Sequence, residues 1–172
     1  KTINFRHIRL FAAAFVCMIL SVSCKDFLSE KPYDFYDEAD FYKNVTELEL
    51  AVNGAFEVLS DKMTYGHFML VTDCDTDVSH VKGSGTGHTA RDLGHYNIYT
   101  AHTWLEEAWG LYYTGIDRVN RIMKNADRVD LPDEDSKKTF SRLIAEAKFL
   151  RAICYFDLVR MWGDVPFKLT AS

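Results

Sequence analysis

The chain has 172 residues, with 25 acidic and 20 basic side chains and a formal net charge of −5. This balance argues against nucleic acid or an anionic membrane surface as the main partner, because both attract basic proteins. The length suffices for one domain with a real core. Aromatic residues make up 14% of the chain, which indicates either a dense core or exposed stacking surfaces.

The first 23 residues have the composition of a secretory signal. Lys1, Arg6 and Arg9 give a basic start without acidic residues, and the apolar run "LFAAAFVCMIL" follows. At about 1.5 Å per residue this run spans only about half of a bilayer core, so it is a poor transmembrane helix. We therefore predict a signal peptide over residues 1–23. Its removal would take away three bases and no acid, leaving 17 bases against 25 acids.

Cys24 directly follows the small residues Ser21 and Ser23. This arrangement resembles a bacterial lipoprotein signal, in which the cysteine is lipidated and becomes the mature N-terminus. Such signals usually carry Leu three residues before the cysteine, whereas here Ser21 holds that place and Leu20 precedes it. The alternative is an ordinary signal peptide followed by an unrelated cysteine. We favour lipidation of Cys24, because no A-x-A-like site offers a better cleavage point.

Residues 24–43 are predicted to form an extended tether, since they contain Pro32, many charges and no sustained period. The aromatic residues of this tether suggest that it lies along the domain surface. The chain begins with Lys rather than Met and stops in the polar residues "VPFKLTAS". We therefore expect the chain to be a fragment of a longer protein, with residues 44–172 as its helical part.

A first helix is predicted over residues 44–61. Asn44 followed by Glu47 fits an N-cap with a capping-box acid. Gly54 lowers helix propensity by about 1 kcal/mol relative to Ala, and the close approach of a neighbouring helix would offset this. Apolar residues recur at steps of three and four, at Val45, Leu48, Val52, Ala55, Phe56 and Leu59.

Residues 61–102 lack a sustained period and contain five glycines. The stretch "HFMLVTD" fits either a short helix or a strand, and the remainder is predicted to be a long irregular loop. Loops of this length in compact domains are uncommon and are usually functional or disordered.

Aromatic and polar side chains gather in and beside this loop. Sugars present C–H faces that stack on aromatic planes, and hydroxyl groups that bond to polar side chains. The alternative is that Tyr99 and Trp104 simply cover the start of the next helix. The residues that we consider candidates for ligand binding are Tyr96, Tyr99, Trp104, Asn97 and Arg91.

Two patterns in the loop suggest metal ligands, but neither is complete. Asp73, Asp75 and Asp77 alternate like the start of a calcium loop, yet the expected later Gly and bidentate acid are missing. A solvated acidic loop is the better interpretation, although calcium stays open.

A second pattern is three histidines spaced by seven, His88, His95 and His102. Such spacing would invite zinc on a single helix. Gly94 and the neighbouring turn residues argue against a helix there. We therefore expect no metal site and no cofactor.

Two longer helices are predicted over residues 103–125 and from about Asp135 to Trp162, joined by a link over residues 126–135. Thr103 with Glu106 is predicted to cap the second helix, and Gly163 to end the third. The helices are expected to pack antiparallel, as in tetratricopeptide-like pairs. Their apolar stripes comprise Leu105, Ala108, Trp109, Tyr112, Ile116, Val119 and Met123, then Phe140, Leu143, Ala147, Leu150, Cys154, Leu158 and Met161.

The stripes also affect how single residues are interpreted. Trp109 and Trp162 lie on helical stripes and are predicted to be core side chains. Gly110 and Gly115 suggest tight helix packing. Cys74 and Cys154 could pair in an oxidising compartment, but the apolar position of Cys154 favours a buried free thiol. The predicted fold class is therefore all-α, with a long irregular loop excursion.

The sequence gives no positive indication of catalysis. Glu106 and Glu107 lie beside a Trp, but adjacent helical positions point about 100° apart and do not face one substrate together. Glu146 and Arg151 are better interpreted as partners of neighbouring helices or caps. The chain contains no G-x-S-x-G, H-E-x-x-H or G-x-x-x-x-G-K motif. We expect a protein that is not an enzyme.

Several segments together resemble the SusD/RagB family of outer-membrane nutrient-binding lipoproteins of Bacteroidetes. The segment "AEAKFLRAICYFDLVRMWGDVPF", residues 145–167, is very similar to the family signature. The segment "WGLYYTGIDRVNRIM", residues 109–123, matches the spacing of a Trp, a Tyr, an Ile and an Asn in the family. "TELELAVNGAFEVLSD", residues 46–61, looks like the first helix, and "DFL" soon after Cys24 completes the set.

The resemblance implies a surface lipoprotein of the outer membrane that captures oligosaccharides or other polymeric nutrients and does no chemistry. It implies a SusC-type TonB-dependent barrel as partner, over which the protein sits as a lid. Family members are much longer, and their C-terminal part normally supplies much of the binding platform. The alternative function is a helical protein–protein scaffold that binds a peptide or the barrel itself.

Overall fold

The computed structural model describes residues 41–66, 76–79, 89–95 and 97–171. These residues fall within one compact unit, Asp37–Ser172. The predicted signal peptide, Cys24 and most of the predicted tether lie outside the described residues.

The described part of the chain is helical, which confirms the all-α prediction. An isolated β-bridge joins Thr76 and Ser79, and the described residues form no β-strand. Across the same residues, no helix has the length and apolar character needed to cross a membrane. The helical elements are α2 (Val45–Ser60), α4 (Thr89–Gly94), α5 (Thr103–Asn125), η2 (Ala126–Arg128) and α6 (Glu134–Trp162).

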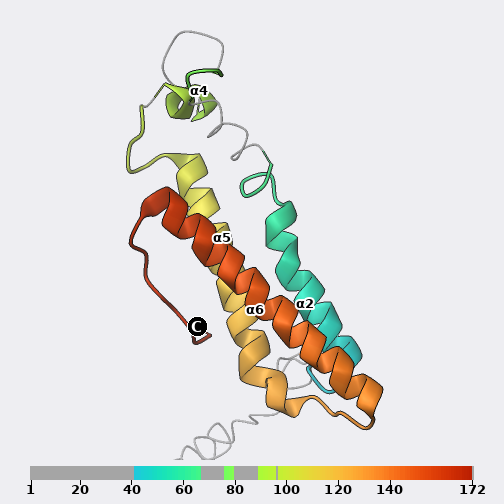
Figure 1. Cartoon of the computed structure of the whole chain (residues 1–172). Helices are drawn as coiled ribbons and strands as arrows, with labels where there is room; N and C mark the ends of the chain where they lie inside the picture. Colours follow the sequence, from blue (N-terminus) through green and yellow to red (C-terminus); the bar gives the residue numbers. More distant parts are fainter. Residues whose placement is uncertain (1–40, 67–75, 80–88, 96, 172) are drawn as a thin grey trace, which may run out of the picture. The chain divides into compact units, whose positions relative to one another are not determined.

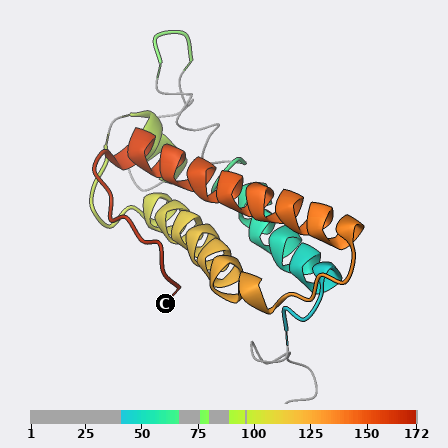
Figure 2. The same ribbon diagram turned by 60° about the horizontal axis from the view of Figure 1, so that its bottom comes forward.

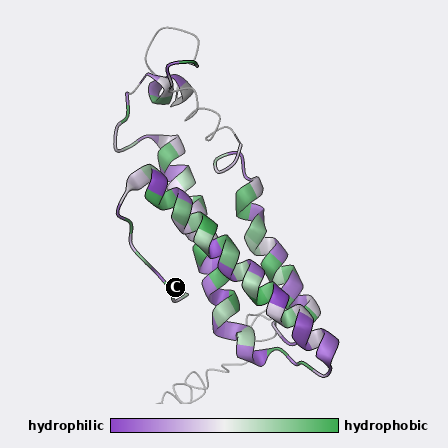
Figure 3. Ribbon diagram, viewed as in Figure 1, coloured by the Kyte–Doolittle hydropathy of each residue, from purple (hydrophilic) through white to green (hydrophobic). Residues whose placement is uncertain are grey.

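Helices α5 and α6 pack antiparallel, and α2 lies against both (Figures 1 and 2). This confirms the predicted pairing of the two long helices. Hydrophobic and hydrophilic residues alternate along all three, as Figure 3 shows. Full burial of a Val, Leu or Ile side chain contributes about 1.5–3 kcal/mol, so the shared core is the main source of stability. Its principal members are Leu48, Val52, Ala55, Val58, Tyr112, Ile116, Val119, Ile122, Leu143, Ala147, Leu150, Cys154 and Leu158.

Side-chain caps fix where α2 and α6 begin. Asn44 Oδ1 accepts from Glu47 N at 3.0 Å, as predicted, while Glu47 Oε2 accepts from Lys43 N at 2.6 Å. Asp133 Oδ1 accepts from Ser136 N at 2.7 Å, so α6 starts at Glu134. Gly163 ends α6 with a φ of 75°, as predicted, and its N–H donates to Val159 O at 2.9 Å. That left-handed backbone favours glycine because it has no Cβ.

The predicted cap of the second helix is wrong. The N-cap of α5 is the buried His102, not Thr103, and it makes no side-chain capping bond. The His102 carbonyl accepts the helical bond from Glu106 N at 3.1 Å. Thr103 is therefore already inside the helix.

The loop contains a helix that the sequence pattern did not reveal. Helix α4 is short and ends at Gly94, the residue taken as evidence against helix. Leu93 is buried in the common core, and Asn97 N donates to Asp92 O at 2.8 Å. One apolar anchor and one terminal bond thus stabilise a helix too short to show a hydrophobic period.

Tight packing at glycine occurs at one of the three predicted positions. A Cβ built on Gly115 would lie 2.8 Å from Val58 Cγ2 and 3.1 Å from Cys154 Sγ. A Cβ on Gly54 or Gly110 would meet nothing within 4 Å. The close-approach explanation is therefore right for Gly115 and wrong for Gly54 and Gly110.

Gly115→Ala is expected to lower the free energy of unfolding by about 1–3 kcal/mol, because the added methyl group overpacks the seam of three helices. Gly110→Ala is the matched control and should be neutral or stabilising by up to about 1 kcal/mol through helix propensity. Urea denaturation of both variants measures the difference. Equal stabilities would contradict the packing described for Gly115.

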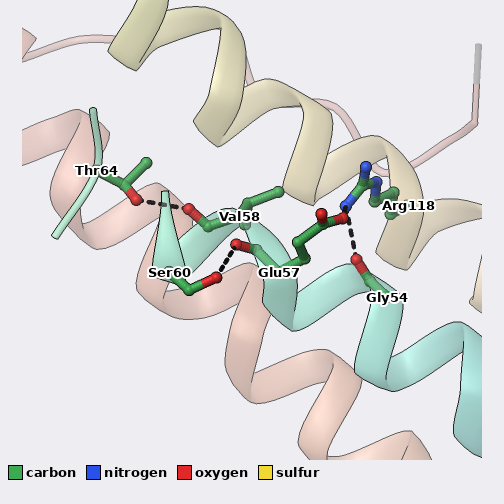
Figure 4. A network of polar contacts seen from close by, with 6 residues as sticks. All are labelled: Gly54, Glu57, Val58, Ser60, Thr64 and Arg118. Atoms are coloured by element: carbon green, nitrogen blue, oxygen red, sulfur yellow. Dashed lines mark hydrogen bonds and ion pairs between the residues drawn. The ribbon is translucent and has the colours of Figure 1, made fainter. Parts of the chain in front are cut away.

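Polar contacts tie α2 to α5 at the surface. Arg118 Nη1 of α5 donates to Gly54 O at 2.6 Å and lies 3.1 Å from Glu57 Oε2 (Figure 4). At the end of α2, Thr64 Oγ1 donates to Val58 O at 2.5 Å (Figure 4). Exposed ion pairs of this kind contribute about 1 kcal/mol or less, so they orient the helices more than they stabilise them.

Candidate functional site

A cleft of about 770 Å³ opens where the segment before α5 meets the first turns of α5 and the end of α6. The segment contributes exposed residues, and the two helices contribute one tryptophan each. The lining residues are Ile98, Tyr99, Thr100, Ala101, Leu105, Glu106, Trp109 and Trp162.

Aromatic rings form the most distinctive wall of this cleft. Trp109 and Trp162 meet edge to face, with ring centroids 5.3 Å apart. Trp109 also packs on Tyr113 at 5.0 Å, outside the cleft lining. Tyr99 is 46% exposed and lies 5.4 Å from the His102 ring. The cleft therefore offers one exposed ring and two half-buried rings that are held in place by their neighbours.

Polar groups accompany the rings. The Glu106 carboxylate and the Thr100 hydroxyl line the cleft, and they supply hydrogen-bond acceptors and a donor beside the aromatic planes. Glu107 is exposed but is not among the lining residues. Of the adjacent pair Glu106 and Glu107, Glu106 alone therefore lines this cleft, as expected from the helical geometry.

Of the two predicted ligand-binding rings that the structure describes, Tyr99 lines the cleft and Trp104 does not. Trp104 is half-buried and packs against the core. Arg91 is half-buried in α4, and Asn97 donates from Nδ2 to Asp92 Oδ1 at 3.3 Å. Tyr96 lies outside the described residues.

The two tryptophans were missed as site residues, because their stripes predicted core positions. Trp109 and Trp162 do pack against the core, but each is only partly buried, and both line the cleft. Helical periodicity identifies the face on which a side chain lies. It does not show where along the helix the packing partner ends. Here the partner ends before the helix does, at the start of α5 and at the end of α6.

The candidate metal patterns do not converge in the described residues. Asp77 is exposed in the turn bridged by Thr76 and Ser79. The described residues do not include Asp73, Asp75, Cys74 or His88. His95 follows α4 and His102 precedes α5, so they do not share a helix. Within the described ranges, no group of three or more His, Cys, Asp or Glu side chains is placed to hold a metal ion.

A second hollow, of about 480 Å³, lies between α5 and the segment 163–171 that follows α6. The side-chain amide of Asn120, which lines this hollow, holds this segment. Asn120 Nδ2 donates to Lys168 O at 3.3 Å and to Thr170 O at 3.1 Å. Arg151 Nη1 of α6 donates to Asn120 Oδ1 at 2.7 Å and so fixes the amide.

Two tyrosines hold the same segment. Tyr113 OH donates to Pro166 O at 2.7 Å. Lys168 N donates to Tyr155 Oη at 2.6 Å, and Tyr155 OH donates to Lys168 O at 2.9 Å. These contacts make the second hollow part of the fold, and we regard the aromatic cleft as the better candidate site.

A buried carboxylate lies at the junction of α6 with the turn after α2. Asp157 is buried, its Oδ2 accepts from Tyr65 OH at 2.5 Å, and its Oδ1 lies 3.5 Å from Arg160 Nη1. Burial and the Asp157 carboxylate raise the pKa of Tyr65 to about 12, and they also raise the pKa of Tyr112. The hydrogen bond from the Tyr65 hydroxyl lowers the cost of burying the Asp157 side chain.

Cys154 belongs to the same buried region. It is a free cysteine, as predicted, and burial followed by the nearby Asp157 charge raises the pKa of its thiol to about 12. The thiolate is the reactive form of cysteine, so at neutral pH this side chain acts as a small core residue and not as a nucleophile.

The described residues form an all-α fold of antiparallel helices with an aromatic cleft at one end. Comparison with known proteins identifies the family of this fold. Residues 26–172 match the SusD-like family model described as starch-binding and associating with the outer membrane. The chain belongs to the SusD-like family.

Curated relatives agree with this assignment. SusD-like protein P25 of Formosa agariphila is 29% identical over 161 residues, covering 89% of this chain and 30% of the relative. SusD-like protein P2 of the same organism is 24% identical, with 91% and 30% covered. A SusD-like protein of Bacteroides ovatus is 25% identical, with 94% and 28% covered. The chain thus spans about 30% of the length of these relatives.

A solved structure supports the fold. The crystal structure of a SusD homolog from Bacteroides thetaiotaomicron superposes with a TM-score of 0.70 at 26% identity. The likeness covers 77% of this chain and 25% of the homolog. The resemblance drawn from three sequence segments is therefore confirmed at the level of family and fold.

Proposed function

We propose that this chain is the N-terminal part of a surface lipoprotein that captures glycans at the outer membrane. The observation that carries the proposal is the family match over residues 26–172, whose description combines starch binding with the outer membrane. The division into a signal peptide (1–23), a tether (24–43) and a helical domain (44–172) belongs to the proposal. So does lipid attachment at Cys24, which would hold the domain at the cell surface.

In this proposal the protein binds and does not catalyse. Captured oligosaccharide or another polymeric nutrient passes to a SusC-type TonB-dependent barrel for import, a partnership implied by the family resemblance. The buried, protonated Cys154 and the internally bonded Asp157 are consistent with a structural role for the titratable groups of α6.

The aromatic cleft supports a sugar subsite within this fragment. The C–H face of a pyranose ring stacks on an aromatic plane, and Tyr99 presents the most exposed ring of the cleft. Glu106 and Thr100 lie where sugar hydroxyls would need hydrogen-bond partners. We therefore propose Tyr99, Trp109 and Trp162 as the stacking residues.

Affinity electrophoresis of the full-length protein in gels loaded with starch and other polysaccharides tests the binding function. We expect retardation by at least one polysaccharide. If no polysaccharide in the panel retards the protein, glycan capture is wrong, and the helical-scaffold alternative gains support.

Ring substitutions test the subsite with the retarding glycan, by calorimetry. Tyr99→Ala and Trp162→Ala are each expected to lower affinity by about 1–3 kcal/mol, the usual cost of losing an anchoring aromatic side chain. Tyr99→Phe keeps the ring and should bind like the wild type. Phe167→Ala removes an exposed ring outside the cleft lining and serves as a second control. Unchanged affinity in both Ala variants would move the site elsewhere in the protein.

A further inference from the structure

The aromatic cleft carries charge of one sign. A glutamate side chain is ordinarily negative at neutral pH, and Glu106 lines the cleft without any Lys, Arg or His among the described lining residues. Glu106 is exposed and lies in the first turn of α5. Within the described residues its carboxylate forms no salt bridge, so the negative charge is available to a ligand.

The chain on either side of the cleft repeats this sign. Residues 98–113, which include the segment before α5 and its first turns, contain Glu106 and Glu107 and no Lys or Arg. At the other wall, Asp164 is exposed in the segment that follows α6. A charged ligand in the cleft therefore meets acidic side chains from both directions.

The basic residue nearest to the cleft along α6 is engaged elsewhere. Arg160 comes two residues before Trp162, and positions two apart on an α-helix point about 200° apart. The Arg160 Nη1 atom lies 3.5 Å from Asp157 Oδ1, and its guanidinium lies 5.3 Å from the centre of the Phe156 ring. Arg160 is not a lining residue, so it does not neutralise Glu106 in the cleft.

The aromatic walls favour the same sign of ligand as the carboxylate. The faces of aromatic rings carry partial negative charge, and Trp attracts a cation more strongly than Tyr or Phe. Trp109, Trp162 and Tyr99 line the cleft together with Glu106. An ammonium group on a bound sugar would be attracted by the rings and by the carboxylate, whereas both would repel a carboxylate or sulfate group.

We propose that the cleft discriminates between glycans by charge and that Glu106 is the residue that sets this specificity. Sugars with free amino groups bind most tightly, neutral sugars bind less tightly, and uronic or sulfated sugars bind most weakly. This rests on the proposed function of the cleft as a sugar subsite. The rings hold the pyranose of any of these sugars, and Glu106 determines which substituents are accepted on it.

Coulomb's law gives the size of the expected discrimination. A unit charge about 5 Å from another changes a binding constant about fourfold even at the dielectric constant of bulk water. Exchange of an ammonium for a carboxylate on the ligand reverses the sign and therefore counts twice. We expect a preference of at least about tenfold for a cationic over an anionic form of the same glycan, with the neutral form between them.

Three forms of one polysaccharide test this order of affinities. The backbone is the polysaccharide that retards the full-length protein in the gels, with starch tested first. It is used unmodified, aminoethylated and carboxymethylated, and both charged forms carry one substituent per sugar on average. Calorimetry at neutral pH measures the three affinities in about 0.15 M salt, where exposed charges more than about 8 Å apart are largely screened.

Glu106→Gln removes the charge and keeps the size of the side chain. It should lower the ratio of the aminoethylated to the carboxymethylated affinity at least about fivefold. This ratio cancels any general effect of the substitution on binding. Glu107→Gln is the matched control, because it removes the same charge at the next position, outside the cleft lining. It should change the ratio less than about twofold, because salt screens the more distant charge.

The outcomes separate charge discrimination from glycan capture itself. Equal affinities of the wild type for all three forms would show that charge discrimination is wrong, while glycan capture would stand. A preference that persists in full in Glu106→Gln would assign it to the overall acidic charge of the protein and overturn the role of Glu106. Tighter binding of the carboxymethylated form, or gel retardation by acidic polysaccharides alone, would overturn the proposed order. If no form binds, glycan capture and charge discrimination are both wrong.

Discussion

Leu150→Asp in the full-length protein is expected to lower the free energy of unfolding by roughly 3–5 kcal/mol, because it buries an unpaired carboxylate. Leu150 is 0% exposed and lies in the core shared by α2, α5 and α6. Among the described residues no Lys or Arg is buried, so none lies in that core to pair with an aspartate. The midpoint of urea denaturation, followed by circular dichroism, measures the loss.

Lys148→Asp is the matched control, since it places the same side chain two residues away on the exposed surface of α6. Its effect should stay within about 0.5 kcal/mol, as for most surface substitutions. If Leu150→Asp unfolds at the same urea concentration as the wild type, the antiparallel packing of α5 and α6 is wrong.

Cys24→Ala is expected to abolish stable attachment to the membrane. One acyl chain gives only marginal and reversible binding, so a lasting anchor needs the several chains of a lipoprotein modification. Without the thiol there is no attachment point, and the protein should be released or should accumulate as an unprocessed precursor. Fractionation of cells and mass spectrometry of the membrane-bound form measure this directly.

Cys74→Ala is the control for this experiment, because it removes another cysteine and keeps the signal intact. It should remain in the membrane fraction. A wild-type mature protein that is soluble and starts at a residue other than Cys24 would refute lipidation.

The three long helices could be predicted because each has an apolar stripe that is long compared with one helical turn. The predicted second helix, 103–125, matches α5 at both ends. The third begins one residue earlier than predicted, because Asp133 acts as its N-cap. Gly163 could be identified as the end of α6, since few other residues adopt its backbone conformation.

The features that escaped prediction depend on contacts between distant segments. Helix α4 has a single core anchor, Leu93, and so shows no period. His102 precedes α5 with a fully buried ring, which its place before the apolar stripe does not indicate. The cleft arises because Trp109 and Trp162, 53 positions apart, meet at the open end of two helices. Periodicity describes one helix at a time and carries no information on such meetings.

The polar residues of the family signature, residues 145–167, have a consequence for how specificity evolves. Arg151 donates a hydrogen bond to Asn120, and Tyr155 is hydrogen-bonded to the Lys168 backbone. Asp157 accepts a hydrogen bond from the Tyr65 hydroxyl. These polar side chains hold distant segments of the chain together and do not line the aromatic cleft. Within residues 145–167, Trp162 is the residue that lines it. A shared signature therefore indicates a common fold and not a common ligand. If the cleft binds a glycan as proposed, changes in residues 98–106 would alter the sugar that is recognised while the scaffold stays the same.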